Sequence, residues 1–180
     1  YKYGADVTAL AEPTKPGYTF SGWDMDAPAK MPAENLVISG TFSINTYNVN
    51  YVVDGEPYDS TPVVYNELAT VIAEPTKTGY SFSGWKTEGG VEYKKGDTFT
   101  MPANDVTLSG EFSKNTYTIT YKVDGEVHKV ESYEFDAPVT ALDAPVKEGY
   151  TFSGWSVTAP EKMPAENLVI EGSFKVNQYD

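Results

Sequence analysis

The sequence contains no cysteine and no arginine, and His128 is its single histidine. Without cysteine there are no disulfides, no thiolate metal sites and no thiol catalysis, so small folded units must depend on their apolar cores. The 13 basic residues are all lysines, and the formal net charge is −13. Because the chain is acidic and lacks the guanidinium group that pairs best with phosphates, we expect no binding to nucleic acid or to an anionic membrane.

What the sequence does contain is an aromatic heptapeptide in three copies, GYTFSGW or GYSFSGW, at residues 17–23, 79–85 and 149–155. An aromatic residue, Tyr3, Tyr65 or Phe135, stands at one fixed distance before the tyrosine of each heptapeptide. Repetition in a fixed register is the signature of an array of small, similar modules.

The register predicts three modules, covering residues 1–46, 47–116 and 117–180. The second copy is longer after its heptapeptide, where it carries the segment KTEGGVEYKKGDTFT. The first copy has no counterpart of the segment that opens the other two, so we expect it to be a partial module that lacks its N-terminal hairpin. The sequence shows no signal peptide or sorting signal, and we expect an interior segment of a longer secreted chain.

Alternating apolar residues predict that each module is mostly β. In the third copy Tyr117, Ile119 and Tyr121 share one face of an extended run that ends at Asp124-Gly125. Asp-Gly tolerates the positive φ angles of a two-residue hairpin turn, and Asp54-Gly55 repeats this signal in the second copy. The heptapeptide predicts a further strand that its Gly-Trp end terminates or bulges. No uninterrupted helical period is present, so we expect a mostly β fold, α+β at most.

The polar residues form no catalytic or metal-binding constellation. His128 is predicted to be an exposed strand residue. Asp54 with Glu56, and Asp124 with Glu126, place two carboxylates beside each hairpin turn, but calcium takes about six to eight oxygen ligands. The acidic residues are scattered through turns, which does not suit the paired carboxylates of a glycosidase. We therefore expect no enzymatic activity, no cofactor and no metal ion.

The repeated aromatic residues have two interpretations. Exposed tryptophan and tyrosine rings stack on sugars, and three copies would add avidity. A cysteine-free module of this size, however, needs aromatic residues inside, where burial of each contributes about 1.5–3 kcal/mol. We favour a structural core made of Tyr18, Phe20, Trp23, Tyr80, Phe82, Trp85, Tyr150, Phe152 and Trp155. A surface contact site is expected instead where the copies differ, at Tyr93, Lys94 and Lys95.

Three blocks carry a family resemblance, and they recur in order: GYTFSGW, MPAENLVISGTF and NTYTITYKVDGE. With these blocks the sequence resembles the Listeria–Bacteroides repeat, also described as the internalin B-repeat, over essentially its whole length. The resemblance implies tandem β-grasp-like modules in an elongated array, with no catalytic residues and no cofactor. It also implies a place in secreted or wall-anchored bacterial proteins.

The repeats, the acidic charge and the resemblance together favour a structural role. We expect a non-catalytic spacer or stalk of an adhesin-like protein, extracellular and located at the bacterial cell surface or cell wall. Two alternatives stay open: direct binding of a host surface protein or a glycan, and self-assembly into a surface filament. The expected partners are neighbouring modules of the same chain, and a monomer is expected rather than an oligomer. Membrane insertion is not expected, because no run of 18 apolar residues is present.

Overall fold

The computed structural model describes residues 1–178, and this part of the chain is built from β-strands without a helix. It follows that no helix among these residues is long and apolar enough to cross a membrane. The prediction of a mostly β fold is confirmed, and the three MPAENL-like segments form bends. Residues 179 and 180 lie outside the described residues, including Tyr179, where the repeat register begins again.

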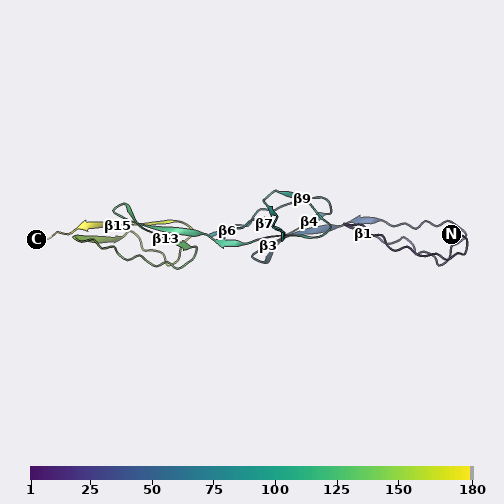
Figure 1. Cartoon of the computed structure of the whole chain (residues 1–180), viewed down its shortest axis with the longest axis horizontal. Helices are drawn as coiled ribbons and strands as arrows, with labels where there is room; N and C mark the ends of the chain where they lie inside the picture. The colour runs from purple at the N-terminus through teal and green to yellow at the C-terminus, as the bar shows by residue number, and fades with distance from the viewer. Residues whose placement is uncertain (179–180) are drawn as a thin grey trace. The chain divides into compact units, whose positions relative to one another are not determined.

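The strands follow the three copies of the repeat. The first copy contains β1 (Tyr18–Phe20) and β2 (Phe42–Ile44). The second copy contains β3 (Thr46–Val53), β4 (Glu56–Val64), β5 (Leu68–Thr70), β6 (Tyr80–Phe82), β7 (Trp85–Lys86), β8 (Glu92–Tyr93), β9 (Thr98–Thr100), β10 (Val106–Gly110) and β11 (Phe112–Lys114). The third copy contains β12 (Thr116–Val123), β13 (Glu126–Glu134), β14 (Tyr150–Trp155) and β15 (Leu168–Val176). The first copy therefore has the least regular structure, and Figure 1 draws most of this purple part of the chain as a plain trace.

The second and third copies open with hairpins at the predicted Asp-Gly turns. β3 pairs antiparallel with β4, and β12 pairs antiparallel with β13. Asp54 and Gly55 have φ angles of 52° and 84°, and Asp124 and Gly125 have φ angles of 52° and 85°. Positive φ at both central residues matches a type I′ turn, whose twist suits the flanking strands. The hairpin predictions are thus confirmed.

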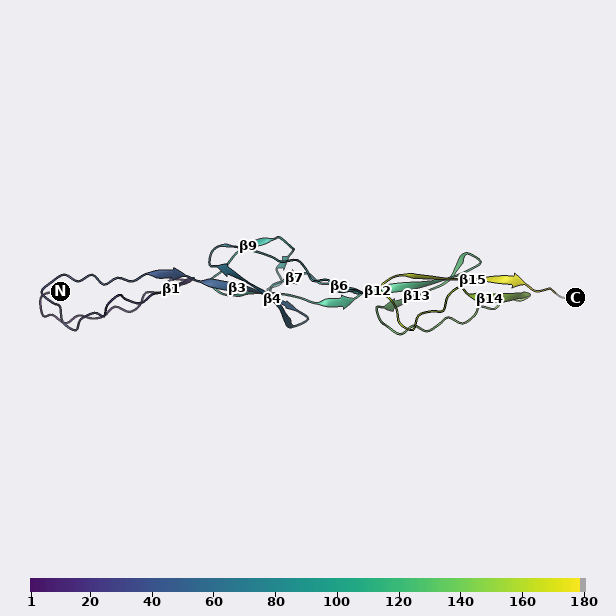
Figure 2. The same cartoon turned by 180° about the vertical axis from the view of Figure 1, so that it is seen from behind.

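A parallel pair of strands joins each hairpin to the last apolar run of its copy. β10 runs parallel to β3 with Val106 opposite Val49, and β15 runs parallel to β12 with Leu168 opposite Ile119. Parallel strands require a long crossover, and here the crossover contains the heptapeptide. The resulting strand orders are β4-β3-β10-β7-β8 and β13-β12-β15-β14, and Figure 2 shows β14 beside β15.

Side-chain alternation places the apolar residues of each sheet on one covered face. Tyr51, Trp85 and Leu108 of the second copy are at most 1% exposed to solvent. Tyr121 and Ile170 occupy the same positions in the third copy and are 1% exposed. Each core thus rests on a hairpin strand, the parallel strand beside it and the tryptophan of the heptapeptide.

The chain divides into two compact units. One unit consists of Tyr1–Glu74 with Gly84–Gly110, and the other of Pro75–Ser83 with Glu111–Asp180. The ladder that β6 forms with β11 therefore groups with the third copy. The division does not separate three modules at residues 46/47 and 116/117, and those boundaries stay predictions from the repeat.

Candidate functional site

The residues of the heptapeptide have two structural roles. In each copy the tyrosine and phenylalanine lie on a strand that pairs antiparallel with the final strand of the same copy. The tryptophan follows a glycine that has a positive φ, between 85° and 93°. Glycine adopts this conformation at no steric cost, so the chain turns there and the tryptophan points towards the sheet.

The nine aromatic residues proposed as cores are buried unequally. Trp85 has no exposed surface, and Tyr150 is 38% exposed. The others are half-buried: Tyr18, Phe20, Trp23, Tyr80, Phe82, Phe152 and Trp155. The three phenylalanines are thus not fully buried, and each lies on a strand with a single neighbour: β1 and β6 belong to two-stranded ladders, and β14 is an edge strand of the four-stranded sheet. Among the described residues Tyr150 packs against one aromatic ring, that of Phe174, whereas Tyr18 and Tyr80 each pack against two, and Tyr150 is accordingly the most exposed.

At Tyr18 and Tyr80, one of the two rings belongs to a contact that the sequence did not predict. The carbonyl of Gly17 accepts a hydrogen bond from the amide of Asn45 at 2.9 Å, and the carbonyl of Asn45 accepts one from the amide of Tyr65 at 2.8 Å. The ring of Tyr65 lies so close to Gly17 that a Cβ atom there would overlap it. Tyr18 meets this ring edge to face, with 5.9 Å between centroids. We call Gly17, Tyr18, Asn45 and Tyr65 the first aromatic junction.

The same contact recurs between the second and third copies. Gly79 accepts from Asn115 at 2.9 Å, and Asn115 accepts from Phe135 at 2.9 Å. Phe135 covers Gly79, and its ring centroid lies 5.8 Å from that of Tyr80. Gly79, Tyr80, Asn115 and Phe135 form the second aromatic junction. The fixed spacing of Tyr65 and Phe135 was visible in the sequence, but their position against the preceding heptapeptide was not.

A lysine ammonium group lies over the ring of each heptapeptide tyrosine. The ammonium groups lie 3.6–4.1 Å from the ring centroids, in the pairs Lys15–Tyr18, Lys77–Tyr80 and Lys147–Tyr150. A cation at this distance from an aromatic face is attracted by about 0.5–1 kcal/mol at an exposed site. The tyrosines at the two junctions thus contact both a lysine and the junction's aromatic ring.

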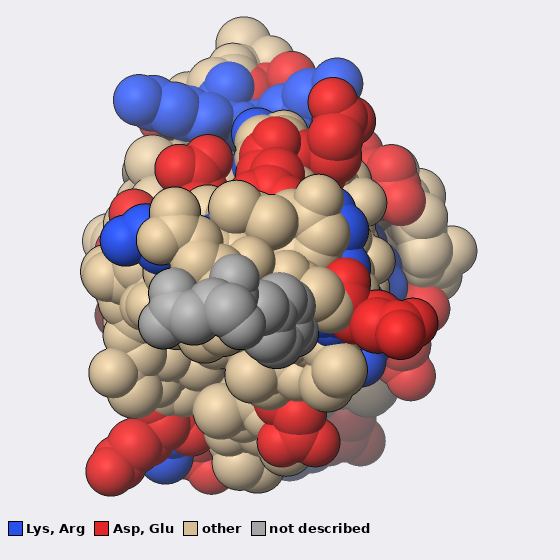
Figure 3. All heavy atoms as spheres, turned by 90° about the vertical axis from the view of Figure 1, so that its left-hand side faces the viewer, with Lys and Arg blue, Asp and Glu red and all other residues tan. Residues whose placement is uncertain are grey.

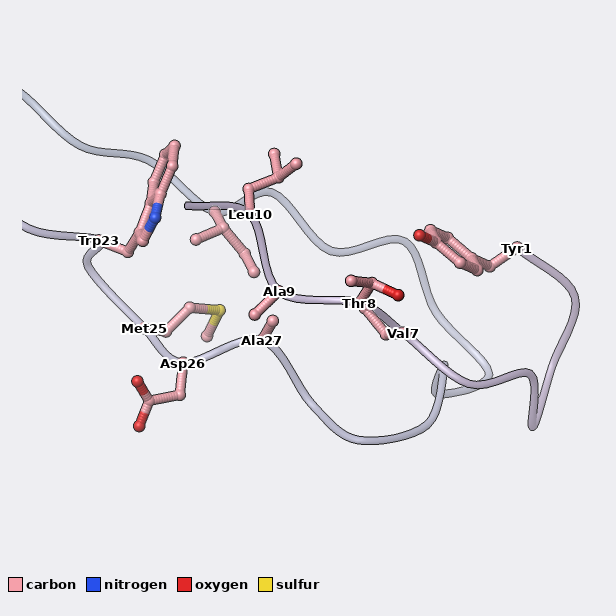
Figure 4. Close-up of a pocket in the computed structure, with 10 residues that line it drawn as sticks. Tyr1, Val7, Thr8, Ala9, Leu10, Trp23, Met25, Asp26 and Ala27 are labelled. Carbon is pink, nitrogen blue, oxygen red and sulfur yellow. The ribbon is translucent and has the colours of Figure 1, made fainter. Parts of the chain in front are cut away.

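The first copy has an open groove at the place where the other copies have their cores. The groove has a volume of about 330 Å³, and its lining includes Val7, Ala9, Leu10, Trp23, Met25 and Ile38. Figure 4 shows Trp23, Leu10 and Met25 near one end of this groove and Tyr1 at the other. Leu10 is 77% exposed. This open groove is concave and lined mainly by apolar residues, and it is our candidate functional site.

Comparison with known proteins identifies the family to which these repeats belong. The sequence model of the Listeria–Bacteroides repeat domain matches residues 1–35, 47–110 and 117–166, which is most of the chain. The chain belongs to the Listeria–Bacteroides repeat family. The three matched segments lie within the three copies defined above, one in each.

Two relatives contain this repeat segment within much longer proteins. Internalin H of Listeria monocytogenes is 40% identical over 116 residues, which are 57% of this chain and 20% of that protein. A relative from Evansella cellulosilytica, named as a Gly-rich membrane protein, is 29% identical over 202 residues, which are 92% of this chain and 23% of that protein. The chain thus spans about a quarter or less of the length of these relatives.

A solved structure, the type 2 repeat of the mucus binding protein MUB from Lactobacillus reuteri, also matches this chain. It is 12% identical, with a TM-score of 0.25, over 74% of this chain and all of that one.

The polar residues considered above as catalytic or metal-binding candidates form no such site in the part of the chain that the structure describes. The Asp124 carboxylate accepts a hydrogen bond from the amide of Phe174 at 3.0 Å, which ties the hairpin turn to β15. His128 is exposed on β13. Within residues 1–178 no three acidic, histidine or cysteine side chains come together in a way that suits a metal ion.

The predicted surface contact site is only partly on the surface. Tyr93 is half-buried in β8 and packs on Phe99, with 5.3 Å between ring centroids. Lys94 and Lys95 are exposed in the turn that follows, where the amide of Lys94 donates to Asp97 at 2.8 Å. The two ammonium groups, and not the tyrosine ring, are therefore the accessible part of this site.

Glu131 and Tyr51 are among the groups with shifted pKa values. Hydrogen bonding from Lys129, at 2.7 Å, lowers the pKa of Glu131, and the Tyr133 hydroxyl also donates to it at 2.8 Å. Burial raises the pKa of Tyr51, whose hydroxyl accepts from the amide of Ile72 at 3.3 Å. Both groups stabilise the fold of their copy, and neither faces the open groove.

Proposed function

We propose that this chain is a non-catalytic spacer segment of a bacterial cell-surface protein, built from β-grasp-like modules. The β-grasp assignment rests on the hairpin at one edge of the sheet and the parallel pair beside it. The surface location rests on the relatives, among them Internalin H, in which the repeat fills only part of a longer protein. The chain is proposed to hold another part of its parent protein away from the cell.

The observation that carries this proposal is the aromatic junction between successive copies. A single residue, Asn45, separates β2 from β3, and a single residue, Asn115, separates β11 from β12. Each asparagine is also held by side chains: its Oδ1 accepts from Thr19 or Ser81, and its Nδ2 donates to the hydroxyl of a tyrosine two residues on. A connection this short, hydrogen-bonded and covered by an aromatic ring restricts bending, which is what a spacer requires.

The charge of the chain suits this role. With a net charge of −13 and no arginine, the surface repels polyanions and other copies of the chain. Figure 3 looks onto the part of the molecule that carries the C-terminus, where acidic and lysine side chains lie interspersed with uncharged ones. We therefore propose a monomer, with neighbouring repeats as its regular contacts.

Small-angle X-ray scattering on chains with two to six repeats tests the spacer function. A spacer predicts a maximum dimension that grows in proportion to the number of repeats, because each module adds a fixed length. A radius of gyration that follows the scaling of a compact globular protein would contradict it. Replacement of Asn45 and Asn115 by flexible Gly/Ser linkers is the matched control, and it is expected to shorten the average dimension.

Direct binding of a host surface protein or a glycan is the second candidate function. It is favoured by one observation, the exposed Lys94 and Lys95 in a segment that the other copies lack. Stacking of sugars on Trp85 is not part of this proposal, because that ring has no exposed surface. A glycan array and pull-down with host-cell surface proteins test it, with Lys94→Ala/Lys95→Ala as the control. Assembly into a filament would instead be seen as concentration-dependent sedimentation.

A further inference from the structure

Tension on a chain of linked copies acts directly on only two strands of each copy. In the third copy the load enters at Asn115, just before β12, and leaves through the end of β15 at Val176. β13 and β14 lie between these two strands in the sequence, and the load reaches them only through their contacts with β12 and β15. The resistance of this copy to tension therefore depends first on how β12 and β15 are joined.

β12 and β15 are joined directly, as parallel neighbours. Their ladder runs from Ile119 opposite Leu168 to Val123 opposite Gly172. Because parallel strands begin at the same end, the start of β12 and the end of β15 lie at opposite ends of the ladder. Tension at these two points slides one strand past the other, so the hydrogen bonds between them are loaded together. β12 also lies between β15 and β13, so its displacement breaks a second ladder.

The hairpin of the same copy resists tension much less when it is pulled at its open end. Thr116 faces Glu134 at this end, and tension between these two residues separates the antiparallel pairs one after another towards the Asp-Gly turn. The copy thus has a direction in which it resists strongly and a direction in which it resists weakly. The entry of the load at Asn115 and its exit at the end of β15 select the first of these.

Both ends of the parallel ladder have additional hydrogen bonds. Before the ladder, the Asn167 side chain accepts from the amide of Thr118 at 2.9 Å. After it, the amide of Asp124 donates to the carbonyl of Gly172 at 3.0 Å, and the Asp124 carboxylate accepts from the amide of Phe174 at 3.0 Å. Each of these bonds joins the segment of β12 to the segment of β15, so sliding of the strands must break them as well.

The buried face of the pair opposes sliding for a second reason. Ile119, Tyr121 and Ile170 belong to the core of the third copy and are at most 1% exposed. A slip of one residue turns the side chains of a strand to the opposite face, which would move Ile170 out of the core. A slip of two residues keeps the faces but displaces the strand by about 6.6 Å. Neither slip is possible while the core stays closed.

The second copy repeats the arrangement within the other compact unit. β3 and β10 are parallel neighbours over five residue pairs. The Asp105 carboxylate accepts from the amide of Asn48 at 2.7 Å at one end, and the carbonyl of Gly110 accepts from the amide of Asp54 at 3.1 Å at the other. The same joint is thus formed twice, from the different sequences VTLSG and LVIEG.

We propose that the two complete copies are load-bearing modules, in which the parallel pairs β3–β10 and β12–β15 act as shear clamps that keep each copy folded under tension. This function goes beyond that of a spacer of fixed length, because the chain also transmits a pulling force without unfolding. It rests on the proposed spacer function only for the origin of the load. The resistance itself is a property of each copy.

Single-molecule force spectroscopy of the whole chain with two attachment geometries tests the proposal. The chain has no cysteine, so two introduced cysteines define the points at which handles are attached. Thr116→Cys with Val176→Cys loads β12 and β15 in shear, and Thr116→Cys with Glu134→Cys pulls the hairpin open. All three side chains are exposed.

The expected result is a higher mean unfolding force in the shear geometry at the same loading rate. Forced unfolding is governed by the rate of unfolding, and we expect a force at least about twofold higher than in the opening geometry. The chain length released, about 3.3–3.6 Å per residue, identifies the unfolding of the third copy. A smaller difference, or a lower force in shear, overturns the proposal.

This outcome is distinct from that of the scattering test of the spacer function. A radius of gyration typical of a compact protein would contradict the spacer but not the clamp, because the handles themselves impose the load. Similar forces in the two geometries would overturn the clamp even if the length of the chain grows with the number of repeats.

Two neighbouring substitutions separate the clamp from general stability. Asn167→Ala removes the side-chain acceptor before the parallel ladder. It is expected to lower the unfolding force in shear and to leave the force that opens the hairpin nearly unchanged. Glu166→Ala, at the exposed residue before it, is expected to change neither force. If Asn167→Ala lowers both forces in the same proportion, or lowers neither, the joint between β12 and β15 does not bear the load.

Discussion

At the scale of single residues, three glycines at the same position of the repeat meet different surroundings. Gly17, Gly79 and Gly149 have φ angles of 74°, 80° and 77°. A Cβ atom at Gly79 would overlap the ring of Phe135, whereas one at Gly149 would meet nothing within 4 Å. Substitution of Gly149 by alanine therefore measures the cost of placing a side chain on a left-handed backbone. The same substitution at Gly79 adds the cost of displacing the ring of Phe135.

Gly79→Ala is expected to destabilise the unit that contains β12–β15 by about 2–4 kcal/mol, because backbone strain and overpacking add. Gly149→Ala is the matched control and is expected to cost about 1–2 kcal/mol, from the backbone alone. Chemical denaturation of both variants measures the difference. Equal costs would show that Phe135 does not hold its position against Gly79 in solution.

Glu131 gives the third copy a specific dependence on acid. Its pKa is lowered in the folded state, by the ion pair with Lys129 first of all. A lowered pKa contributes stability above the ordinary value of 4.5, and this contribution is lost as the pH falls through the folded-state value. Glu131→Gln is expected to lower the free energy of unfolding by about 0.5–1 kcal/mol at pH 7 and by less at pH 3.

Urea denaturation of the native chain and the Glu131→Gln variant from pH 7 to pH 3 measures this prediction, at low protein concentration because the isoelectric point lies near 4.4. Glu126→Gln, at an exposed carboxylate of the same hairpin, is the control and is expected to change stability little at either pH. A constant difference between Glu131→Gln and the native chain across this range would contradict the assigned pKa shift.

The residues that the sequence predicted well are those whose role is local. The Asp-Gly turns follow from backbone preference alone, and both are found with positive φ. The degree of burial of Tyr150 and of the three phenylalanines could not be read from the sequence, because it depends on which strands and rings lie beside them. Alternation shows which face of a strand a side chain is on, but not what covers that face.

At the scale of strands, the same sequence pattern forms a strand only where a neighbour supplies hydrogen bonds. Ile38 and Ile170 have equivalent places in LVISG and LVIEG, but Ile170 is 1% exposed and Ile38 is half-buried. Truncation of a fully buried isoleucine leaves a cavity as well as losing apolar contacts. Truncation of the isoleucine at the two positions therefore shows how much the parallel pairing contributes to the stability of a copy.

Ile170→Ala is expected to destabilise its unit by about 2–4 kcal/mol. Ile38→Ala is expected to cost less than about 1 kcal/mol, because its side chain already contacts water on one side. Denaturation followed by a probe in each copy measures both values. Similar costs would indicate that the first copy has a closed core in solution, and therefore that its groove is not open.

The heptapeptide strand shows where prediction from sequence ends at this scale. The sequence predicted the strand, and its predicted glycine bulge corresponds to the register shift between Phe152 and Trp155. The tyrosine and phenylalanine of the strand do not lie in the centre of a core, because their strand belongs to a two-stranded ladder in the first two copies and is an edge strand of the sheet in the third. The ladder groups with the following copy, because the next hairpin supplies the ring that covers it. A sequence repeat fixes the period of the array, but the period does not show which residues pack together.

At the scale of the whole molecule, the junctions make each copy depend on its neighbour. Nearest-neighbour contacts in a repeat protein couple the unfolding of adjacent modules. The first junction, at Tyr65, connects the first and second copies within one compact unit. Tyr3 has the position of Tyr65 in the first copy but is 80% exposed. Of these two equivalent tyrosines, Tyr65 is packed in a junction and Tyr3 is exposed.

Tyr65→Ala is expected to uncouple the first copy from the second. Removal of the ring leaves the β1–β2 ladder uncovered, so the first copy is expected to melt at a lower temperature than the second, as a separate transition in differential scanning calorimetry. The calorimetric enthalpy of that unit would then exceed its van't Hoff enthalpy. Tyr3→Ala, the matched control, is expected to leave the thermogram unchanged. If both variants melt like the native chain, the aromatic junction does not couple the copies, and the restriction on bending that the spacer function requires must come from Asn45 and its hydrogen bonds alone.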